Sequence, residues 1–104
     1  MEQNSVLKIT VSHNGNEYTI GLIGRLDTLT SPDLEDKLED VIEDAEKLIF
    51  DLSQLEYISS AGLRVLLGAA QEMDERGEMV IRSLTEPVQD VFDVTGFSDA
   101  FNIE

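Results

Sequence analysis

Apolar and polar residues alternate at the start of the chain, which is the period of a half-buried β-strand. Within residues 6–12, apolar side chains occupy every second position from Leu7 onward. The alternation stops at residues 13–16 and resumes over residues 18–22. The Asn14-Gly15 dipeptide in the gap adopts positive φ at little cost, so the two segments predict a β-hairpin.

The next segment has a helical period. A polar loop at residues 25–30 leads to Ser31-Pro32, a common N-cap residue followed by a proline, which suits the first turn of a helix. Apolar side chains then recur at helical spacing, at Leu34, Leu38, Val41, Ile42 and Ala45. Most of the other positions up to residue 44 are acidic, so the pattern predicts an amphipathic helix with a strongly acidic outer face.

The apolar run at residues 48–52 does not alternate, which is typical of a strand covered on both faces in the middle of a sheet. A second helical stripe follows, at Leu63, Leu66, Leu67, Ala70 and Met73. Gly68 interrupts this helix and predicts a close approach of helix and sheet at that position. Arg76-Gly77 ends the predicted helix.

The last third of the chain predicts a strand at residues 79–81 and a third helix. Thr85 and Pro87 open this helix and Gly96 closes it as a C-cap. We expect the three apolar residues of the tail to pack against the core, namely Phe97, Phe101 and Ile103. The order strand, strand, helix, strand, helix, strand, helix predicts an α/β fold, with crossover helices packed on a mixed sheet of four to five strands. Residues 1–104 are expected to form a single domain.

Charge narrows the range of partners. With 22 acidic and 7 basic residues the net charge is −15, which disfavours nucleic acid and anionic membranes as partners. The charge serves either solubility or the steering of a basic protein partner, and its sign alone does not separate the two. The sequence has no cysteine, no basic and apolar start, and no apolar run that would predict membrane insertion, so a cytoplasmic protein is expected.

The residues give little support for catalysis. The only histidine, His13, lies in the first hairpin turn, remote in sequence from the serines of interest. The chain has no nucleophile elbow, phosphate-binding loop or dinucleotide fingerprint. The acidic residues at 33–44 follow helical spacing and lack a calcium-loop pattern. We therefore expect no catalytic residue, no cofactor and no metal.

The turn at residues 57–63 is the unusual feature, because it places small polar residues between a buried strand and an apolar helix. One interpretation is that Ser60 or Ser59 caps the helix by accepting a backbone N–H hydrogen bond. The other is that a hydroxyl here is exposed to a kinase, and that free N–H groups and the helix dipole would tolerate a phosphate. The pattern alone leaves both open.

The sequence also resembles a known family. The segment Asp51-Leu52-Ser53-x-Leu55-x-Tyr57-Ile58-Ser59-Ser60-Ala61-Gly62-Leu63 is similar to the signature of STAS domains, the anti-anti-sigma factors of bacteria. Gly24-Arg25-Leu26-Asp27 resembles the Gly-x-Leu-Asp turn that precedes the first helix of that family, and residues 87–97 resemble its last helix. The resemblance covers nearly the whole chain in the right order.

The resemblance implies a function and a set of site residues. It implies a protein, monomeric when free, that binds an anti-sigma factor with serine kinase activity and so releases a sigma factor. Phosphorylation of Ser60 would cancel binding, and Asp27 matches a residue that helps to dock the kinase. Many kinase-regulated members have aspartate where this chain has Ser59. The implied partner surface comprises Gly24, Asp27, Thr28, Ser31, Ser59, Ser60, Gly62, Leu63 and Arg64.

Two alternatives remain. The chain could be a STAS-domain partner subunit that regulates a transporter or another signalling complex, since the sequence does not specify the partner. A hydrolase that uses Ser60 as its nucleophile would require His13 to approach that serine.

Overall fold

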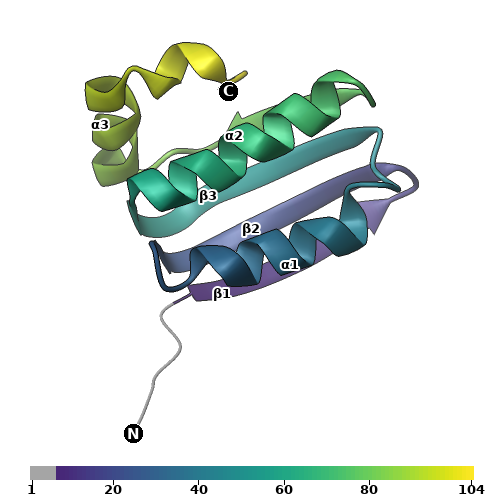
Figure 1. Ribbon diagram of the computed structural model, residues 1–104, viewed down its shortest axis with the longest axis horizontal. Coiled ribbons are helices and arrows are strands. Elements are labelled where there is room, and N and C mark those ends of the chain that lie inside the picture. Colours follow the sequence, from purple (N-terminus) through teal and green to yellow (C-terminus); the bar gives the residue numbers. More distant parts are fainter. Residues whose placement is uncertain (1–6) are drawn as a thin grey trace, which may run out of the picture.

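The computed structural model describes residues 7–104, and its sheet begins with the expected hairpin (Figure 1). Strands β1 (Leu7–Asn14) and β2 (Glu17–Leu26) pair antiparallel, with Leu7 opposite Gly24 and Asn14 opposite Glu17. Gly15 takes the positive φ of the turn, at 63°. Residue 6, the predicted start of the first strand, lies outside the described residues, as do residues 1–5 of the expected single domain.

The other two strands are parallel to β2. The sheet has the order β1-β2-β3-β4, with β3 at Lys47–Ile58 and β4 at Glu78–Arg82. Helices α1 (Ser31–Val41) and α2 (Ser60–Asp74) form the crossovers. Right-handed crossovers that advance in one direction across a sheet place their helices on the same face. Figure 1 shows α1 and α2 side by side on one face, and the predicted mixed sheet is confirmed with four strands.

The core lies between the sheet and these two helices. Fully buried leucines of α1 and α2, such as Leu34 and Leu66, pack against β-strand residues such as Phe50. Ile49, on the opposite side of β3 from Phe50, is only 2% exposed, as its apolar run predicts. No helix within residues 7–104 is long and apolar enough to span a membrane.

The C-terminal segment completes the fold as expected. Helix α3 (Glu86–Thr95) ends at Gly96, whose φ of 79° is the left-handed C-cap conformation. The 3-10 helix η1 (Phe97–Ala100) follows. Phe101 packs against the core and Ile103 forms a bridge to Ile81 beside β4. The hydroxyl of Thr85 donates to the carbonyl O of Leu55 at 2.7 Å, which fastens the start of α3 to β3.

Two local predictions are wrong. Ser31 is the first residue of α1 and not its N-cap, a position that Thr30 occupies without a side-chain capping bond. Gly68 does not permit close packing on the sheet, because it is exposed and no atom lies within 4 Å of a Cβ placed on it. Its position is about 200° around the helix from the buried Leu66, on the side away from the sheet.

Candidate functional site

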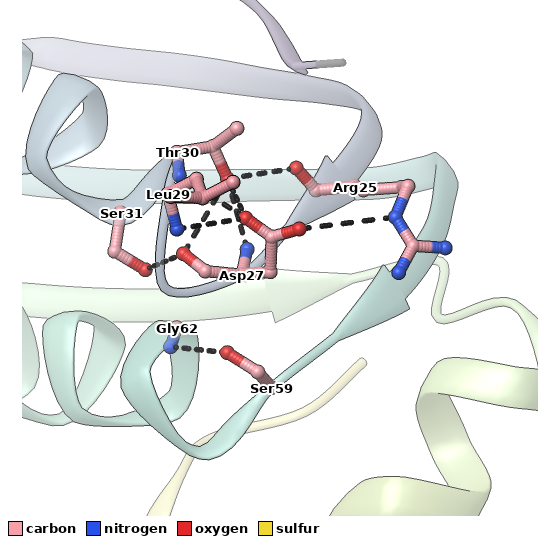
Figure 2. A network of polar contacts seen from close by, with 7 residues as sticks. All are labelled: Arg25, Asp27, Leu29, Thr30, Ser31, Ser59 and Gly62. Atoms are coloured by element: carbon pink, nitrogen blue, oxygen red, sulfur yellow. Dashed lines mark hydrogen bonds and ion pairs between the residues drawn. The ribbon is translucent and has the colours of Figure 1, made fainter.

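Two turns meet at the carboxyl ends of β2 and β3. Parallel pairing places Leu26 beside Ile58, so the segments that follow these strands start at the same edge of the sheet. The backbone N–H of Ser59 donates to the carbonyl O of Leu26 at 2.9 Å. The two parts of the partner surface that the family resemblance implies, the loop before α1 and the turn before α2, are therefore neighbours in the fold (Figure 2).

The Asp27 loop, which we define as residues 25–31, is held by the side chain of Asp27. Its carboxylate Oδ1 accepts hydrogen bonds from the N–H groups of Leu29 at 3.0 Å and Thr30 at 3.1 Å. The N–H of Asp27 donates to Oγ1 of Thr30 at 2.8 Å, and this hydroxyl donates to the carbonyl O of Arg25 at 2.9 Å. The carboxylate thus closes an Asx-type turn, and the hydroxyl of Thr30 holds the same turn through its own hydrogen bonds.

Ser31 belongs to the same network. Its hydroxyl and its N–H both donate to the carbonyl O of Asp27, at 2.6 and 2.8 Å. The residue is only 4% exposed. Ser31 was expected at the partner surface, but its burial and its internal hydrogen bonds give it a structural role in the loop.

The loop carries a fixed negative charge. Partial desolvation raises the pKa of Asp27, but hydrogen bonds from Thr30 and Leu29 and the charge of Arg25 together hold this pKa below its usual value of 3.8. Nε of Arg25 lies 3.8 Å from Oδ2 of Asp27. The same guanidinium lies over the ring of Tyr57, 4.4 Å from its centroid. The Asp27 carboxylate is therefore ionised at neutral pH, beside a positioned cation.

The two serines of the second turn have different roles. Ser59 has an extended backbone, and its Oγ accepts a hydrogen bond from the N–H of Gly62 at 3.4 Å. Ser60 is the first residue of α2, is exposed, and makes no side-chain hydrogen bond to any residue in the described part of the chain. The sequence did not decide which serine caps α2, and the structure shows that it is Ser59. The hydroxyl of Ser60 therefore does not stabilise the fold through a hydrogen bond within the described residues.

Gly62 and Leu63 lie on the buried side of this turn and pack against the ends of β2 and β3 and the core. A Cβ on Gly62 would lie 2.8 Å from Cγ of Leu26 and 2.9 Å from Cγ1 of Ile58. Glycine therefore allows the start of α2 to approach the ends of both strands. Leu63 is 1% exposed. Both residues were expected at the partner surface, but they are buried and position the turn without facing solvent.

A shallow cleft lies between the first turns of the two helices. Its volume is about 270 Å³, and both helices and the Asp27 loop line it, with Thr28, Ser31, Pro32, Glu35, Ala61, Arg64 and Val65. Of the predicted partner residues, Thr28, Ser60 and Arg64 are exposed, whereas Gly24, Asp27 and Ser59 are half-buried. The structure thus brings the predicted residues into one region. Three of them, Thr28, Ser60 and Arg64, are exposed and accessible to a partner.

Sequence reasoning missed Leu29. This leucine is 85% exposed, although it lies in the tightly bonded Asp27 loop. An apolar side chain held in solvent by a rigid turn is a suitable anchor for a protein partner. The available signal was a single leucine in an otherwise polar loop at residues 27–31.

The geometry contradicts a hydrolase in which His13 is the base for Ser60. His13 pairs with Tyr18 at the hairpin end of β2, and its ring stacks on that tyrosine with 4.7 Å between centroids. Ser60 follows Ile58, which pairs with Leu26 at the other end of β2. Eight strand residues separate the two ends, or about 25 Å at roughly 3.3 Å per residue. Because the chain has no second histidine, Ser60 has no histidine base.

Comparison with known proteins identifies a family and close structural relatives. The STAS domain model matches residues 8–104. The chain is 32% identical to BtrV of Bordetella bronchiseptica over 99 aligned residues. The alignment covers 93% of this chain and 85% of BtrV. The chain is 28% identical over 98 residues to the anti-sigma-B factor antagonist of Bacillus subtilis, with 93% and 90% covered.

Solved structures show the same fold at lower identity. An anti-sigma factor antagonist from Mycobacterium paratuberculosis superposes with a TM-score of 0.85 at 21% identity, covering 93% of this chain and 84% of that one. The phosphorylated form of the Bacillus cell fate determinant SpoIIAA superposes with a TM-score of 0.73 at 18% identity, covering 93% and 91%.

Proposed function

The chain belongs to the STAS domain family, and we propose from that premise that it is an anti-sigma factor antagonist, a binding protein and not an enzyme. The observation that carries the proposal is the pairing of two features at one sheet edge. These are the rigid, charged Asp27 loop and the exposed hydroxyl of Ser60, which the fold does not use. The relatives named as anti-sigma factor antagonists support the choice of partner.

In this proposal the exposed part of the edge contacts the anti-sigma factor. Leu29 and Thr28 project from the Asp27 loop, and Ser60 and Arg64 lie on the first turns of α2. Binding would release the sigma factor that the partner otherwise holds. A surface with a net charge of −15 disfavours self-association, so the free protein is expected to be a monomer.

We propose further that the partner is a serine kinase and that Ser60 is its substrate. The N–H groups of the first helical turn have no intrahelical acceptor, and they lie at the positive end of the α2 dipole. Arg64 is one turn along α2 from Ser60, the spacing at which helical side chains interact. A phosphate on Ser60 would therefore be tolerated by the fold itself.

The same phosphate would act against the partner. A phosphoserine carries about −1.5 to −2 charges at neutral pH, and an interface must desolvate this charge. The ionised carboxylate of Asp27 belongs to the same surface and adds to the negative potential there. Phosphorylation would thus switch off binding by placing charge in the interface, while the domain stays folded.

Phosphate mapping tests this proposal. The protein is incubated with ATP and the anti-sigma factor kinase of its host, and mass spectrometry locates the phosphate. We expect modification of Ser60 in the wild type and in Ser59→Ala, and none in Ser60→Ala. Phosphate on Ser31, Ser53 or Ser59 with Ser60 unmodified would contradict the site. Capture of a transporter or another signalling protein in place of an anti-sigma factor would instead favour the partner-subunit alternative.

A further inference from the structure

A second groove lies between α1 and α2, on the face of these helices that points away from the sheet. Its volume is about 500 Å³, and its lining runs along α2 from Arg64 to Glu72 and continues to Arg76, just beyond the end of that helix. The floor is apolar and includes Ile42, Val65 and Ala69. The eight residue steps from Arg64 to Glu72 correspond to about 12 Å at roughly 1.5 Å per residue, so the groove is long enough for about two turns of another helix.

The two walls of this groove differ in charge. On the α1 side the wall carries Glu35 and Glu39 of the helix and Glu43 of the turn that follows it, at intervals of four residues, and none of the three forms an ion pair within residues 7–104. On the α2 wall, Glu72 pairs with Arg76 at 3.4 Å. The other cation of the lining, Arg64, lies on α2 at the end of the groove nearest the Ser60 turn. A ligand in the groove therefore meets a row of carboxylates without ion pairs on the α1 side, and its cationic flank must face that side.

Gly68 lies in this groove and has no role in the fold. It is exposed in the middle of α2, and a Cβ placed on it would meet no atom within 4 Å. A glycine inside a helix is less favourable than alanine, so the position lowers stability without a steric reason in the free protein. A bare helix surface does, however, allow another chain to approach closely.

We propose that this groove binds a basic amphipathic helix of a partner protein. The apolar stripe of that helix packs on the floor, its backbone approaches α2 at Gly68, and a row of lysines or arginines faces the glutamates of α1. The pairing is of the helix-in-groove kind. A second copy of this chain is a poor occupant, because each copy carries a net charge of −15. The groove shares Glu35, Arg64 and Val65 with the cleft beside the Ser60 turn and extends from there toward Arg76. The inference does not rest on the proposed function.

The test uses a synthetic peptide as the probe. We choose a 16-residue peptide, which as a helix is about 24 Å long and so spans the groove with residues to spare at each end. It has leucines at i, i+3, i+4 and i+7 spacing and lysines along one flank, and it is labelled with a fluorophore. A peptide of the same composition in scrambled order is the control ligand. Binding is measured by anisotropy, and the site is mapped by amide chemical shifts of the full chain. We expect shifts at groove residues such as Val65 and Gly68, and at least tenfold weaker binding of the scrambled peptide.

Variants of the protein separate the groove from general charge attraction. Gly68→Leu fills the groove with a residue that favours helix, so it should retain or raise the thermal midpoint while weakening peptide binding at least tenfold. Gln71→Leu adds the same side chain to an exposed position of α2 outside the groove and should bind like the wild type. Glu39→Gln combined with Glu43→Gln should weaken binding and reduce its dependence on salt.

Three results would overturn the proposal. The first is equal binding of the ordered and scrambled peptides, and the second is unchanged binding by Gly68→Leu. The third is a dimer of the free protein in sedimentation equilibrium that Gly68→Leu dissociates, because a second copy would then be the occupant. Loss of kinase recognition at Ser60 would leave all three measurements unaffected, so failure of the proposed function is distinguishable.

Discussion

The Asp27 loop and the Ser60 turn are neighbours, but they are held in different ways. The carboxylate of Asp27 and the hydroxyl of Thr30 tie the loop through several hydrogen bonds of 2.8–3.1 Å. The turn has one side-chain bond, from the N–H of Gly62 to Ser59 at 3.4 Å, and Ser60 contributes none. The difference is what the proposed switch requires, because the loop has a fixed shape and the turn presents a hydroxyl that no hydrogen bond of the described chain uses, which phosphorylation would charge.

The largest expected effect comes from adding charge at the turn. Ser60→Asp should weaken binding to the anti-sigma factor about 100-fold, or roughly 3 kcal/mol, because the new carboxylate must be desolvated in the interface. Isothermal titration calorimetry measures the affinity, and a circular dichroism melt checks that the variant is folded. Ser60→Ala is the matched control, and its affinity should stay within about twofold of the wild type since truncating this free hydroxyl removes no hydrogen bond of the fold. An aspartate variant that binds as tightly as the wild type would refute the charge mechanism.

Removing one hydroxyl from the loop should cost stability. Thr30 is 5% exposed, and its hydroxyl accepts from the N–H of Asp27 and donates to the carbonyl O of Arg25. Thr30→Val keeps the shape but leaves both groups without this partner, so unfolding by urea should show a loss of about 1–3 kcal/mol. Thr28→Val, on an exposed residue of the same loop, should change stability by less than about 0.5 kcal/mol. Equal losses in the two variants would mean that the loop is not braced by Thr30.

The charge of Asp27 should make the loop sensitive to acid. Its pKa is lowered in the folded chain, so its ionised form stabilises the fold above about pH 3.8, and this contribution is lost as the pH falls through the lower folded pKa. Asp27→Asn should therefore melt below the wild type at pH 7, and the difference should shrink below pH 4. Thermal melts of both proteins across this range measure the effect. A difference that does not change with pH would show that the charge is unimportant.

The smallest effect concerns the cap of α2. Ser59→Ala removes the one side-chain hydrogen bond that the turn makes within residues 7–104. At 3.4 Å this bond is long, so we expect a loss near the low end of capping effects, at about 0.5–1 kcal/mol. Ser60→Ala should cost less than this, because its hydroxyl is not a cap. Urea unfolding of the two variants in parallel compares them. A larger loss for Ser60→Ala would reverse the roles given to these serines.

The sequence predicted the order of elements because each has a strong local signal. The alternation before Gly15 and the acidic amphipathic helix after Pro32 depend on periodicity alone, and both are confirmed. The choice of cap between Ser59 and Ser60 could not be made in this way. Both serines precede the same apolar helix, and only the register of Leu26 with Ile58, a contact distant in sequence, fixes where β3 ends and α2 begins.

The sequence predicted which residues belong to the candidate site better than it predicted which of them are exposed to solvent. A motif names the residues of a turn, but which of them face solvent depends on contacts from the neighbouring turn. The side chain of Leu26 packs against Gly62. The carbonyl O of Asp27 accepts hydrogen bonds from both the hydroxyl and the N–H of Ser31. Leu29 belongs to no pattern, and it becomes noticeable only once the bonds of Asp27 show that its loop is rigid.

The antiparallel entry of β1 has a practical consequence for binding assays. Leu7 lies opposite Gly24, three residues before Asp27, so the chain enters the sheet at the edge that carries both turns. An affinity tag or fluorescent protein joined upstream of Leu7 would be tethered beside the proposed partner surface and would compete with a partner for space there. At the other terminus, Glu104 is hydrogen-bonded to Ile81 along β4, on the far side of β3 from that entry point. Labels for measuring affinity therefore belong at the C-terminus.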